Sequence, residues 1–256
     1  MLVMLNISAY FDRIGYCGPN EPTVEVLRHI HRSHLFNVPF ENLDIALGHK
    51  IVCDESAFIR KIVELRRGGF CYELNGAFAA LLRATGFQVT LLSARVARED
   101  GSYSPEFDHL ALRVDLGEPW LADVGFGDLF LEPVRLRAGL LQEQDGQKFR
   151  ISEGGDTFLL ERSDGEGKWK QEYLLTLTPH GLSDFALRCH YHQTSPESSF
   201  TRKSICTIAT PFGRVTLSDQ KLIFTRNGFK EEKPLTSEAE RQAALKEYFG
   251  IVLAEP

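Results

Sequence analysis

The chain has 256 residues with 43% hydrophobic and 25% charged side chains, the ordinary composition of a globular protein. Its formal net charge of −6 and the lack of any run of lysine or arginine argue against nucleic acid as a partner. No segment approaches the roughly 18 consecutive apolar residues of a membrane span, so we expect no membrane partner either.

Helical patterns fill the first third of the sequence. Apolar residues recur at helical spacing over residues 23–34, shortly after a proline that suits a helix start. Asp54 is expected to cap a second helix that continues to Leu65. Between these helices, segment 38–43 must be non-helical near Pro39, because a proline favours an extended backbone before it.

A third helix is predicted to follow the Gly68–Gly69 pair, with Cys71 in its first turn, and to end at Gly86, a typical left-handed cap. Its apolar stripe comprises Leu74, Ala77, Phe78, Leu81 and Leu82. Free N–H groups and the positive end of the helix dipole favour a thiolate there, so we expect a lowered pKa for Cys71. A free cysteine is more often a small buried hydrophobe, and a nucleophilic role requires a base.

From residue 88 onward the pattern changes to short apolar or alternating runs separated by turn residues. These runs predict mostly antiparallel strands in a barrel or sandwich-like sheet. The predicted strands cover residues 89–96, 110–116, 120–124, 158–162 and 172–176. The polar segment 142–156 is expected to form a long loop or a broken hairpin.

After residue 184 the sequence mixes both patterns. Three short runs predict a final meander, over residues 205–208, 214–217 and 221–226. Ser237 and Glu240 have the spacing of a capping box, and Gly250 marks the end of a closing helix over 237–249. The order of helices, then strands, then strands with a terminal helix indicates an α+β fold.

A nucleophilic cysteine needs a base, and His109 is the best placed of the eight histidines. If the hairpin that follows it turns at Gly117, His109 and Asp123 become diagonal neighbours on one face of the sheet. There the carboxylate would fix the imidazole tautomer and stabilise the imidazolium. A register slip of one residue would place the two side chains on opposite faces.

The other cysteines and histidines do not form a convincing metal site. The five cysteines are scattered, odd in number and without a Cys-x-x-Cys pair, which indicates a reducing cytoplasm and no structural zinc. His29, His31 and His34 lie close in sequence, but the first two point about 200° apart on a helix. Residues Cys189–His192 are expected to alternate along an extended segment without further ligands. We therefore expect no metal.

Several segments stand in the order in which they occur in arylamine N-acetyltransferases, and the chain resembles this family along nearly its whole length. These segments are residues 10–15 (YFDRIG), 38–43 (VPFENL), 67–71 (RGGFC), 108–110 (DHL), 121–127 (LADVGFG) and 194–200 (TSPESSF). Because the chain has no room for a long insertion before its last third, it looks like the bacterial type of the family.

The resemblance implies an N-terminal helical bundle over residues 1–86, a central antiparallel β-barrel over 87–186 and a C-terminal α/β lid over 187–256. It implies a catalytic triad of Cys71, His109 and Asp123 where these units meet. The implied reaction is a ping-pong transfer of an acetyl group from acetyl-CoA to the nitrogen of an arylamine or arylhydrazine, through acetyl-Cys71. No tightly bound cofactor is implied, and we expect a cytoplasmic monomer or homodimer.

Further positions follow from the same resemblance. The residues that match an aromatic acceptor pocket are Phe40, Val96, Phe126, Phe130 and Phe200. Gly127 is expected to let CoA approach the backbone closely, and Glu41 and Arg67 are expected to pair beside the nucleophile. Core packing of the aromatic residues and separate solvation of the two charges are the plain alternatives.

Two other activities stay open. An amide synthase of the same family, which closes a macrolactam, would carry the same triad. A cysteine hydrolase or transglutaminase-like enzyme would also use this triad logic, without CoA.

Overall fold

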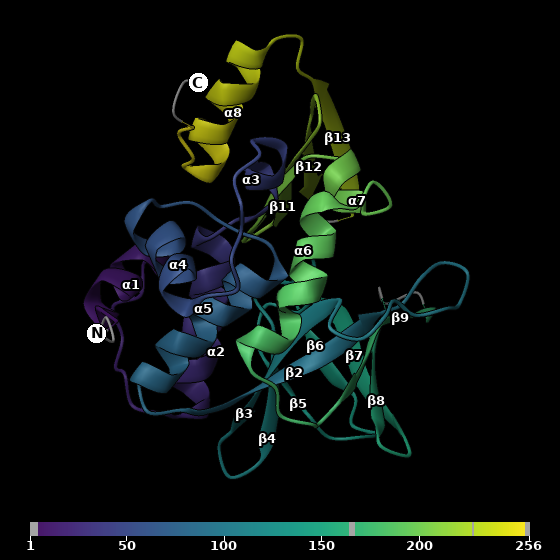
Figure 1. The fold of residues 1–256 in the computed structure, drawn as a ribbon. Helices are drawn as coiled ribbons and strands as arrows, with labels where there is room; N and C mark the ends of the chain where they lie inside the picture. Colours follow the sequence, from purple (N-terminus) through teal and green to yellow (C-terminus); the bar gives the residue numbers. More distant parts are fainter. Residues whose placement is uncertain (1–4, 164–166, 227, 254–256) are drawn as a thin grey trace.

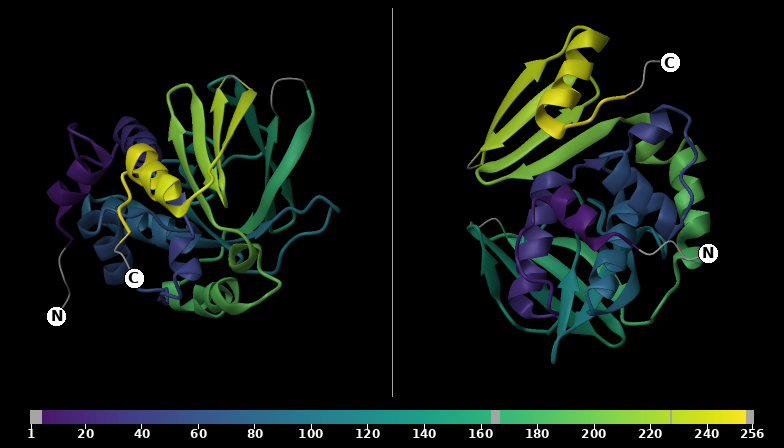
Figure 2. Two further views of the ribbon diagram at one scale, coloured as in Figure 1. Left: turned by 90° about the horizontal axis from the view of Figure 1, so that it is seen from above. Right: turned by 90° about the vertical axis from the view of Figure 1, so that its left-hand side faces the viewer.

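Helices of the N-terminal third pack beside two antiparallel sheets in the computed structural model, which describes residues 5–163, 167–226 and 228–253 (Figure 1). In the right-hand view of Figure 2, the purple and blue helices lie between the teal sheet and the yellow-green sheet. The predicted α+β class is confirmed. Among the described residues, no helix combines the length and apolar character needed to cross a bilayer.

The predicted N-terminal helices are present, and their starts are capped as the sequence indicates. They are α2 (Val24–Asn37), α4 (Glu55–Ile59) and α5 (Cys71–Ala84), and α1 (Ile7–Ile14) and α3 (Leu43–Ala46) form in addition. The side chains of Thr23 and Asp54 accept hydrogen bonds from the N–H groups of Val26 and Ala57, which would otherwise lack partners. After α4 the backbone widens into a π-helical turn, Arg60–Glu64, before it reaches the glycine pair.

Helix α5 lies at the centre of the helical region and is almost wholly buried. Twelve of its 14 residues are buried, because α4 and strands of the first sheet cover it on several sides. Cys71 is its first residue and so lies in its first turn, as predicted. Gly86, with a φ of +89°, turns the chain just after the helix ends, in the left-handed conformation that glycine adopts readily.

The first sheet has eight strands and forms a nearly closed barrel. Its strands are β2 (Gln88–Val96), β3 (His109–Asp115), β4 (Pro119–Ala122), β5 (Val134–Arg135), β6 (Gln142–Gln144), β7 (Gln147–Gly154), β8 (Thr157–Ser163) and β9 (Trp169–Thr176). They are hydrogen-bonded in the order β5-β4-β3-β2-β9-β8-β7-β6. Of the two alternatives for segment 142–156, the long loop is wrong and the hairpin is confirmed, because β6 and β7 pair in this segment.

Two glutamine side chains join the edges of the barrel, where β5 and β6 are not paired directly. Gln142 accepts from the N–H of Arg135 at 2.7 Å and donates to its carbonyl at 3.1 Å. Gln144 makes the same pair of bonds to the backbone of Glu132, at 2.9 and 2.8 Å. These amides satisfy backbone groups that an open sheet edge would expose.

The second sheet contains the predicted meander and two strands that the sequence did not predict, β1 (Phe40–Glu41) and β13 (Phe229–Pro234). Its other strands are β10 (Ile205–Thr210), β11 (Gly213–Ser218) and β12 (Lys221–Arg226), and the strands pair in the order β1-β10-β11-β12-β13. Helix α8 (Glu238–Phe249) begins after Ser237 and ends before Gly250, as predicted. It packs on this sheet. The short β1 comes from the helical third of the chain and pairs with β10.

The segment that leads into the second sheet is helical. A 3₁₀ turn (Leu182–Phe185), α6 (Ala186–Thr194) and α7 (Ser199–Arg202) occupy it. The prediction of an extended segment over Cys189–His192 is therefore wrong. Cys189 and His192 are both buried and lie three residues apart, a spacing that fits one face of a helix rather than of a strand.

The division into three units stays a prediction. The boundary at 86/87 falls in the turn between α5 and β2, whereas the boundary at 186/187 falls inside the first turn of α6. Strand β1 crosses the division, because it belongs to the first unit by sequence and to the second sheet by hydrogen bonding. Residues 1–4 and 254–256 of the outer units lie outside the described residues.

We expect Gly68→Ala to destabilise the protein by about 1–3 kcal/mol, the usual range for overpacking. A Cβ atom at this position would lie 2.0 Å from the carbonyl oxygen of Pro39, which is backbone and moves only with the chain. Chemical unfolding of the two proteins measures the difference. Gly181→Ala is the matched control, because the nearest atom to its added Cβ is the Ser183 hydroxyl at 3.5 Å. Equal stabilities of the two variants would contradict the expectation.

Candidate active site

Residues 39–41 form backbone contacts with the turn that precedes Cys71. The N–H of Glu41 donates to the carbonyl of Gly69 at 2.9 Å, and Phe40 and Gly69 form a short parallel bridge. This close approach requires a residue without a side chain at position 68. The glycine pair is therefore fixed by backbone contacts rather than free to move.

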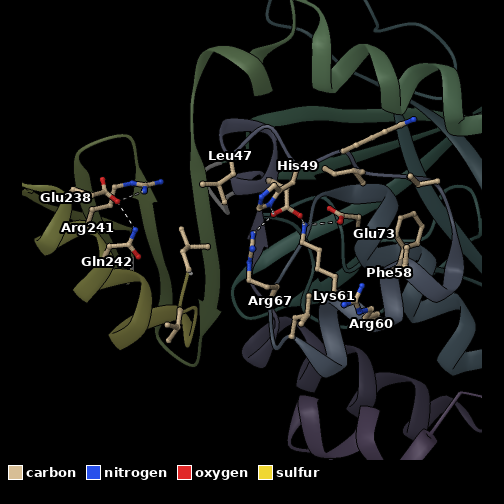
Figure 3. A pocket seen from close by; sticks show the side chains of 18 residues that line it. Leu47, His49, Phe58, Arg60, Lys61, Arg67, Glu73, Glu238, Arg241 and Gln242 are labelled. Carbon is tan, nitrogen blue, oxygen red and sulfur yellow. Dashed lines mark hydrogen bonds and ion pairs between the residues drawn. The ribbon is translucent and has the colours of Figure 1, made fainter. Parts of the chain in front are cut away.

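A largely buried network of five charged side chains lies beside this turn, and Figure 3 shows Lys61, Arg67 and Glu73 of this network. Arg67 lies 2.8 Å from Glu41 and 3.0 Å from Asp44. Lys61 lies 2.8 Å from Asp44 and 2.9 Å from Glu73, a residue of the first turn of α5. The predicted pair of Glu41 and Arg67 is confirmed, within a larger network.

This network carries one more carboxylate than it has cations. The three carboxylates of the network form ion pairs with only two cations of the network, Lys61 and Arg67; these carboxylates belong to Glu41, Asp44 and Glu73. Glu73 also accepts a hydrogen bond from the N–H of Phe70 at 3.1 Å. Burial outweighs the attraction of Lys61 and raises the pKa of Glu73 from 4.5 to about 7.

His109 and Asp123 meet as the hairpin geometry predicts. Leu112 pairs with Ala122 in strands β3 and β4, the register that a turn at Gly117 requires. His109 Nε2 lies 2.7 Å from Asp123 Oδ2, and both side chains are buried. Because Nε2 is bound to the carboxylate, Nδ1 is the ring nitrogen left for a proton from the thiol.

Asn75 joins helix α5 to this pair, although the sequence analysis did not select it. It lies one turn after Cys71 and is fully buried. Its amide nitrogen donates to Asp123 Oδ1 at 2.8 Å and to the carbonyl of Leu110 at 2.6 Å. Its amide oxygen accepts from the N–H of Val124 at 2.9 Å. One feature of the sequence could have indicated Asn75: it is an amide four residues after Cys71, and residues four apart on a helix lie on the same face.

Gly125 contacts both the Asp123 carboxylate and the backbone of Cys71. Burial would raise the pKa of Asp123, but His109, Asn75 and the N–H of Gly125 hold it below its usual value. A Cβ atom on Gly125 would lie 2.9 Å from the Cα of Cys71, so only glycine allows this approach.

The expected lowering of the Cys71 pKa is wrong for the thiol in this structure. The residue is only 4% exposed. Burial, followed by the charges of Asp108 and Asp123, raises its pKa well above the usual value, although the N–H groups of Leu110 and Tyr72 oppose this. Loss of hydration therefore exceeds the effect of the helix start. A thiolate here requires a proton acceptor inside the site.

Asp108 is another residue that the sequence analysis did not select. It precedes His109 and lies 2.6 Å from Arg188 and 3.1 Å from His192, both on α6. Burial would raise its pKa, but His192 and then Arg188 lower it to about 2. This pairing attaches α6 to the strand that carries His109.

The predicted aromatic residues are not all in one place. The rings of Phe126 and of the buried Tyr173 lie 5.2 and 5.3 Å from that of His109. Phe200 packs at 6.1 Å from Phe40 and at 5.9 Å from Phe70. Val96 lies on β2 directly opposite Tyr173, so its side chain shares a face of the sheet with that ring. Tyr173, which the sequence analysis missed, fills the space beside the imidazole.

A cleft of about 770 Å³ opens between the segment after Asp123 and the second sheet. The predicted residues in its lining are Phe40, Phe126, Gly127 and Phe130. Phe126 also contacts His109, so the cleft leads toward the His109–Asp123 pair. A second cavity, of about 820 Å³, lies beside Lys61 and Arg67 and is not lined by any triad residue (Figure 3).

The arrangement is suited to covalent acyl transfer, because an imidazole with an orienting carboxylate is joined through Asn75 to the helix that begins with a thiol. Within the described ranges, no group of three or more histidine, cysteine or acidic side chains is arranged to hold a metal ion.

Comparison with known proteins agrees with this chemistry. A family model for N-acetyltransferases matches residues 23–256. The chicken arylamine N-acetyltransferase described as pineal gland isozyme NAT-3 is 35% identical over 275 residues, covering 97% of this chain and 95% of that protein. The arylamine N-acetyltransferase structure from Salmonella typhimurium has a TM-score of 0.92 at 32% identity, covering 98% of this chain and 93% of that one. The Mycobacterium marinum enzyme in complex with CoA has a TM-score of 0.88 at 30% identity, covering 96% and 93%.

The fold and the matched model define an acyltransferase. The chain belongs to the arylamine N-acetyltransferase family, and the resemblance read from its motifs is confirmed.

The raised pKa of Glu73 predicts a specific pH dependence of stability. Its folded-state pKa of about 7 lies above the ordinary 4.5, so the carboxyl disfavours folding increasingly as the pH rises from 4.5 to 7. Glu73→Gln removes this titration, and its stability relative to wild type should rise by up to about 3 kcal/mol over that range. Urea unfolding at a series of pH values measures the difference.

Glu161→Gln provides a control with the opposite sign. Its hydrogen bond to Arg150 lowers the pKa of Glu161, so the stabilisation is lost as the pH falls below about 4.5. A Glu73→Gln difference that stays flat between pH 4.5 and 7 would contradict the assignment.

Proposed function

We propose that this chain transfers an acetyl group from acetyl-CoA to the nitrogen of arylamines or arylhydrazines, through an acetyl-Cys71 intermediate. The observation that carries the proposal is the hydrogen bond of 2.7 Å between His109 and Asp123, joined by Asn75 to the helix that begins at Cys71. The family membership and the CoA complex of the M. marinum relative support acetyl-CoA as the donor.

In the first half-reaction, the Cys71 thiol gives its proton to Nδ1 of His109, and the thiolate attacks the thioester carbonyl. The bond between the carbonyl carbon and the CoA sulfur then breaks, and the imidazolium returns the proton to the departing CoA thiolate. Asp123 accepts from Nε2–H throughout, which keeps Nδ1 free as the base and stabilises the imidazolium.

In the second half-reaction, the amine nitrogen attacks the carbonyl of acetyl-Cys71. His109 accepts a proton from the nitrogen, the carbon–sulfur bond breaks, and Cys71 recovers its proton. The raised pKa of the thiol fits this scheme, because a buried thiol loses its proton to a neighbouring base more readily than to water.

The cleft beside Phe126 offers a place for both substrates. Phe40 and Phe130 provide flat apolar walls that suit an aryl ring. Gly127 has no side chain, so the thioester end of acetyl-CoA can approach the backbone there. Arg214 and Lys230 line the same cleft and supply positive charge for the phosphates of CoA. We propose a cytoplasmic location, because all five cysteines are free. A monomer or homodimer stays our prediction.

Acetyl-CoA alone should leave one acetyl group on the protein, and intact-mass measurement detects it. Cys71→Ala should gain none, because the thiol that accepts the group is gone. Cys17→Ser is the matched control, since it removes an exposed cysteine and should be labelled like wild type. Equal labelling of wild type and Cys71→Ala, or no labelling of wild type, would contradict the proposal. If Cys71 is labelled only by acyl donors other than acetyl-CoA, the protein is an amide synthase or a hydrolase instead.

Asp123→Asn should lower the rate of acetyl transfer by roughly 10,000-fold, the effect of the corresponding change in a serine protease triad. The amide favours the wrong imidazole tautomer while preserving the volume of the side chain. Single-turnover kinetics measure the rate, and circular dichroism verifies that the variant is folded. A loss below tenfold would remove Asp123 from the proposed mechanism.

A further inference from the structure

His31 lies beneath the triad, on the middle of helix α2, and its side chain is fully buried. Its Nδ1 atom lies 2.8 Å from the carbonyl oxygen of Leu131. Its Nε2 atom lies 3.1 Å from the backbone nitrogen of Asp123, which can only donate. One imidazole therefore connects α2 to two backbone groups about 100 residues away in the chain.

Only one form of the imidazole satisfies both contacts. A carbonyl accepts, so Nδ1 must carry the proton, and an N–H donates, so Nε2 must be bare. The doubly protonated ring would direct an N–H of its own at the N–H of Asp123. Burial agrees with the neutral form, because it lowers the pKa of His31 from 6.5 to about 4.

The two backbone groups are the ends of one loop. Residues 123–131 connect the end of β4 to the approach to β5 and carry Asp123, Gly125 and Phe126, which contact Cys71 or His109. The imidazole stacks on Phe130 of the same loop, with ring centroids 5.7 Å apart. It also meets Phe78 of α5 edge-on at 5.8 Å. His31 thus closes the loop by polar contacts and rests against the helix of the nucleophile.

The contacts of Asp123 divide between its side chain and its backbone. His109, Asn75 and the N–H of Gly125 bind the carboxylate. His31 binds the backbone N–H, a group that would be buried without a partner if the imidazole were absent. The carboxylate can reach Nε2 of His109 only from a backbone held at this place.

We infer that His31 is a positioning residue, whose neutral Nδ1–H imidazole holds the Asp123 loop so that Asp123 orients His109 toward Cys71. The catalytic role of His31 rests on the proposed function. The effect of His31 on the reactivity of the Cys71 thiol does not require that the protein transfers acetyl groups.

His31→Leu tests the inference, because leucine retains an apolar side chain but makes neither hydrogen bond. We expect the alkylation rate of Cys71 by iodoacetamide at neutral pH, measured on the Cys71 peptide by mass spectrometry, to fall roughly 10- to 100-fold, the effect of a small misplacement of catalytic groups. Acetyl transfer from acetyl-CoA should fall by a similar factor in kcat, with a smaller change in KM. His31→Gln, whose amide can replace one of the two bonds, should recover part of the loss.

His34→Leu is the matched control. His34 lies one turn further along α2, is equally buried, and bonds to the hydroxyl of Tyr10 at 3.1 Å rather than to the loop. It should lose stability like His31→Leu while Cys71 keeps its wild-type alkylation rate. If both leucine variants slow alkylation equally, or if neither does, His31 only packs and the inference is overturned.

Two further measurements separate the possible failures. ¹⁵N NMR of wild type should detect an Nδ1–H imidazole for His31, a result that does not depend on whether any variant folds; an Nε2–H imidazole would overturn the inference. If acetyl-CoA fails to label wild type but His31→Leu still slows alkylation, the proposed function fails and the positioning role stands.

Discussion

The carboxylate of Asp123 is the group on which the site depends, because a buried charge without partners is too costly to keep ionised. Its partners come from separate parts of the chain: His109 from β3, Asn75 from α5, and the N–H of Gly125 from its own loop. Each partner that satisfies the charge also fixes an element of the site. The ionised form survives because these bonds outweigh the burial that alone would raise its pKa.

A second buried network holds the opposite side of the same helix turn. Glu73 and Asn75 lie two and four residues after Cys71, so they project in different directions from the start of α5. Glu73 reaches the cluster of Lys61, Arg67 and Asp44, whereas Asn75 reaches Asp123. The first turn of the helix is therefore held from both sides by polar contacts. An apolar core alone would leave the rotation of this helix less well defined, since it is buried almost all round.

Local rules accounted for the parts of the structure that the sequence predicted. The caps at Thr23 and Asp54, the start of α5 and the register set by Gly117 each depend on residues close together in the chain.

The parts of the structure that the sequence did not predict depend on partners far away in the chain. Strand β1 forms only because β10 pairs with it, and the glutamines that join the barrel edges have no sequence pattern of their own. His31 looked like one of several helix histidines, since its partners lie about 100 residues away. The pKa of Cys71 was misjudged because a helix start is a local feature, whereas burial belongs to the whole fold.

The raised pKa of Cys71 gives the positioning contacts their importance in the proposed reaction. An exposed thiol with a low pKa would exist as thiolate in water, and a displaced base would cost it little. A buried thiol has no such alternative: in the proposed mechanism its proton goes to His109, and Asp123 stabilises the resulting imidazolium. The free energy of the ion pair therefore depends directly on how well Asp123 is held. Contacts that never touch the substrate, such as those of Asn75 and the loop backbone, then affect the nucleophile itself, and the network around one carboxylate becomes part of its reactivity.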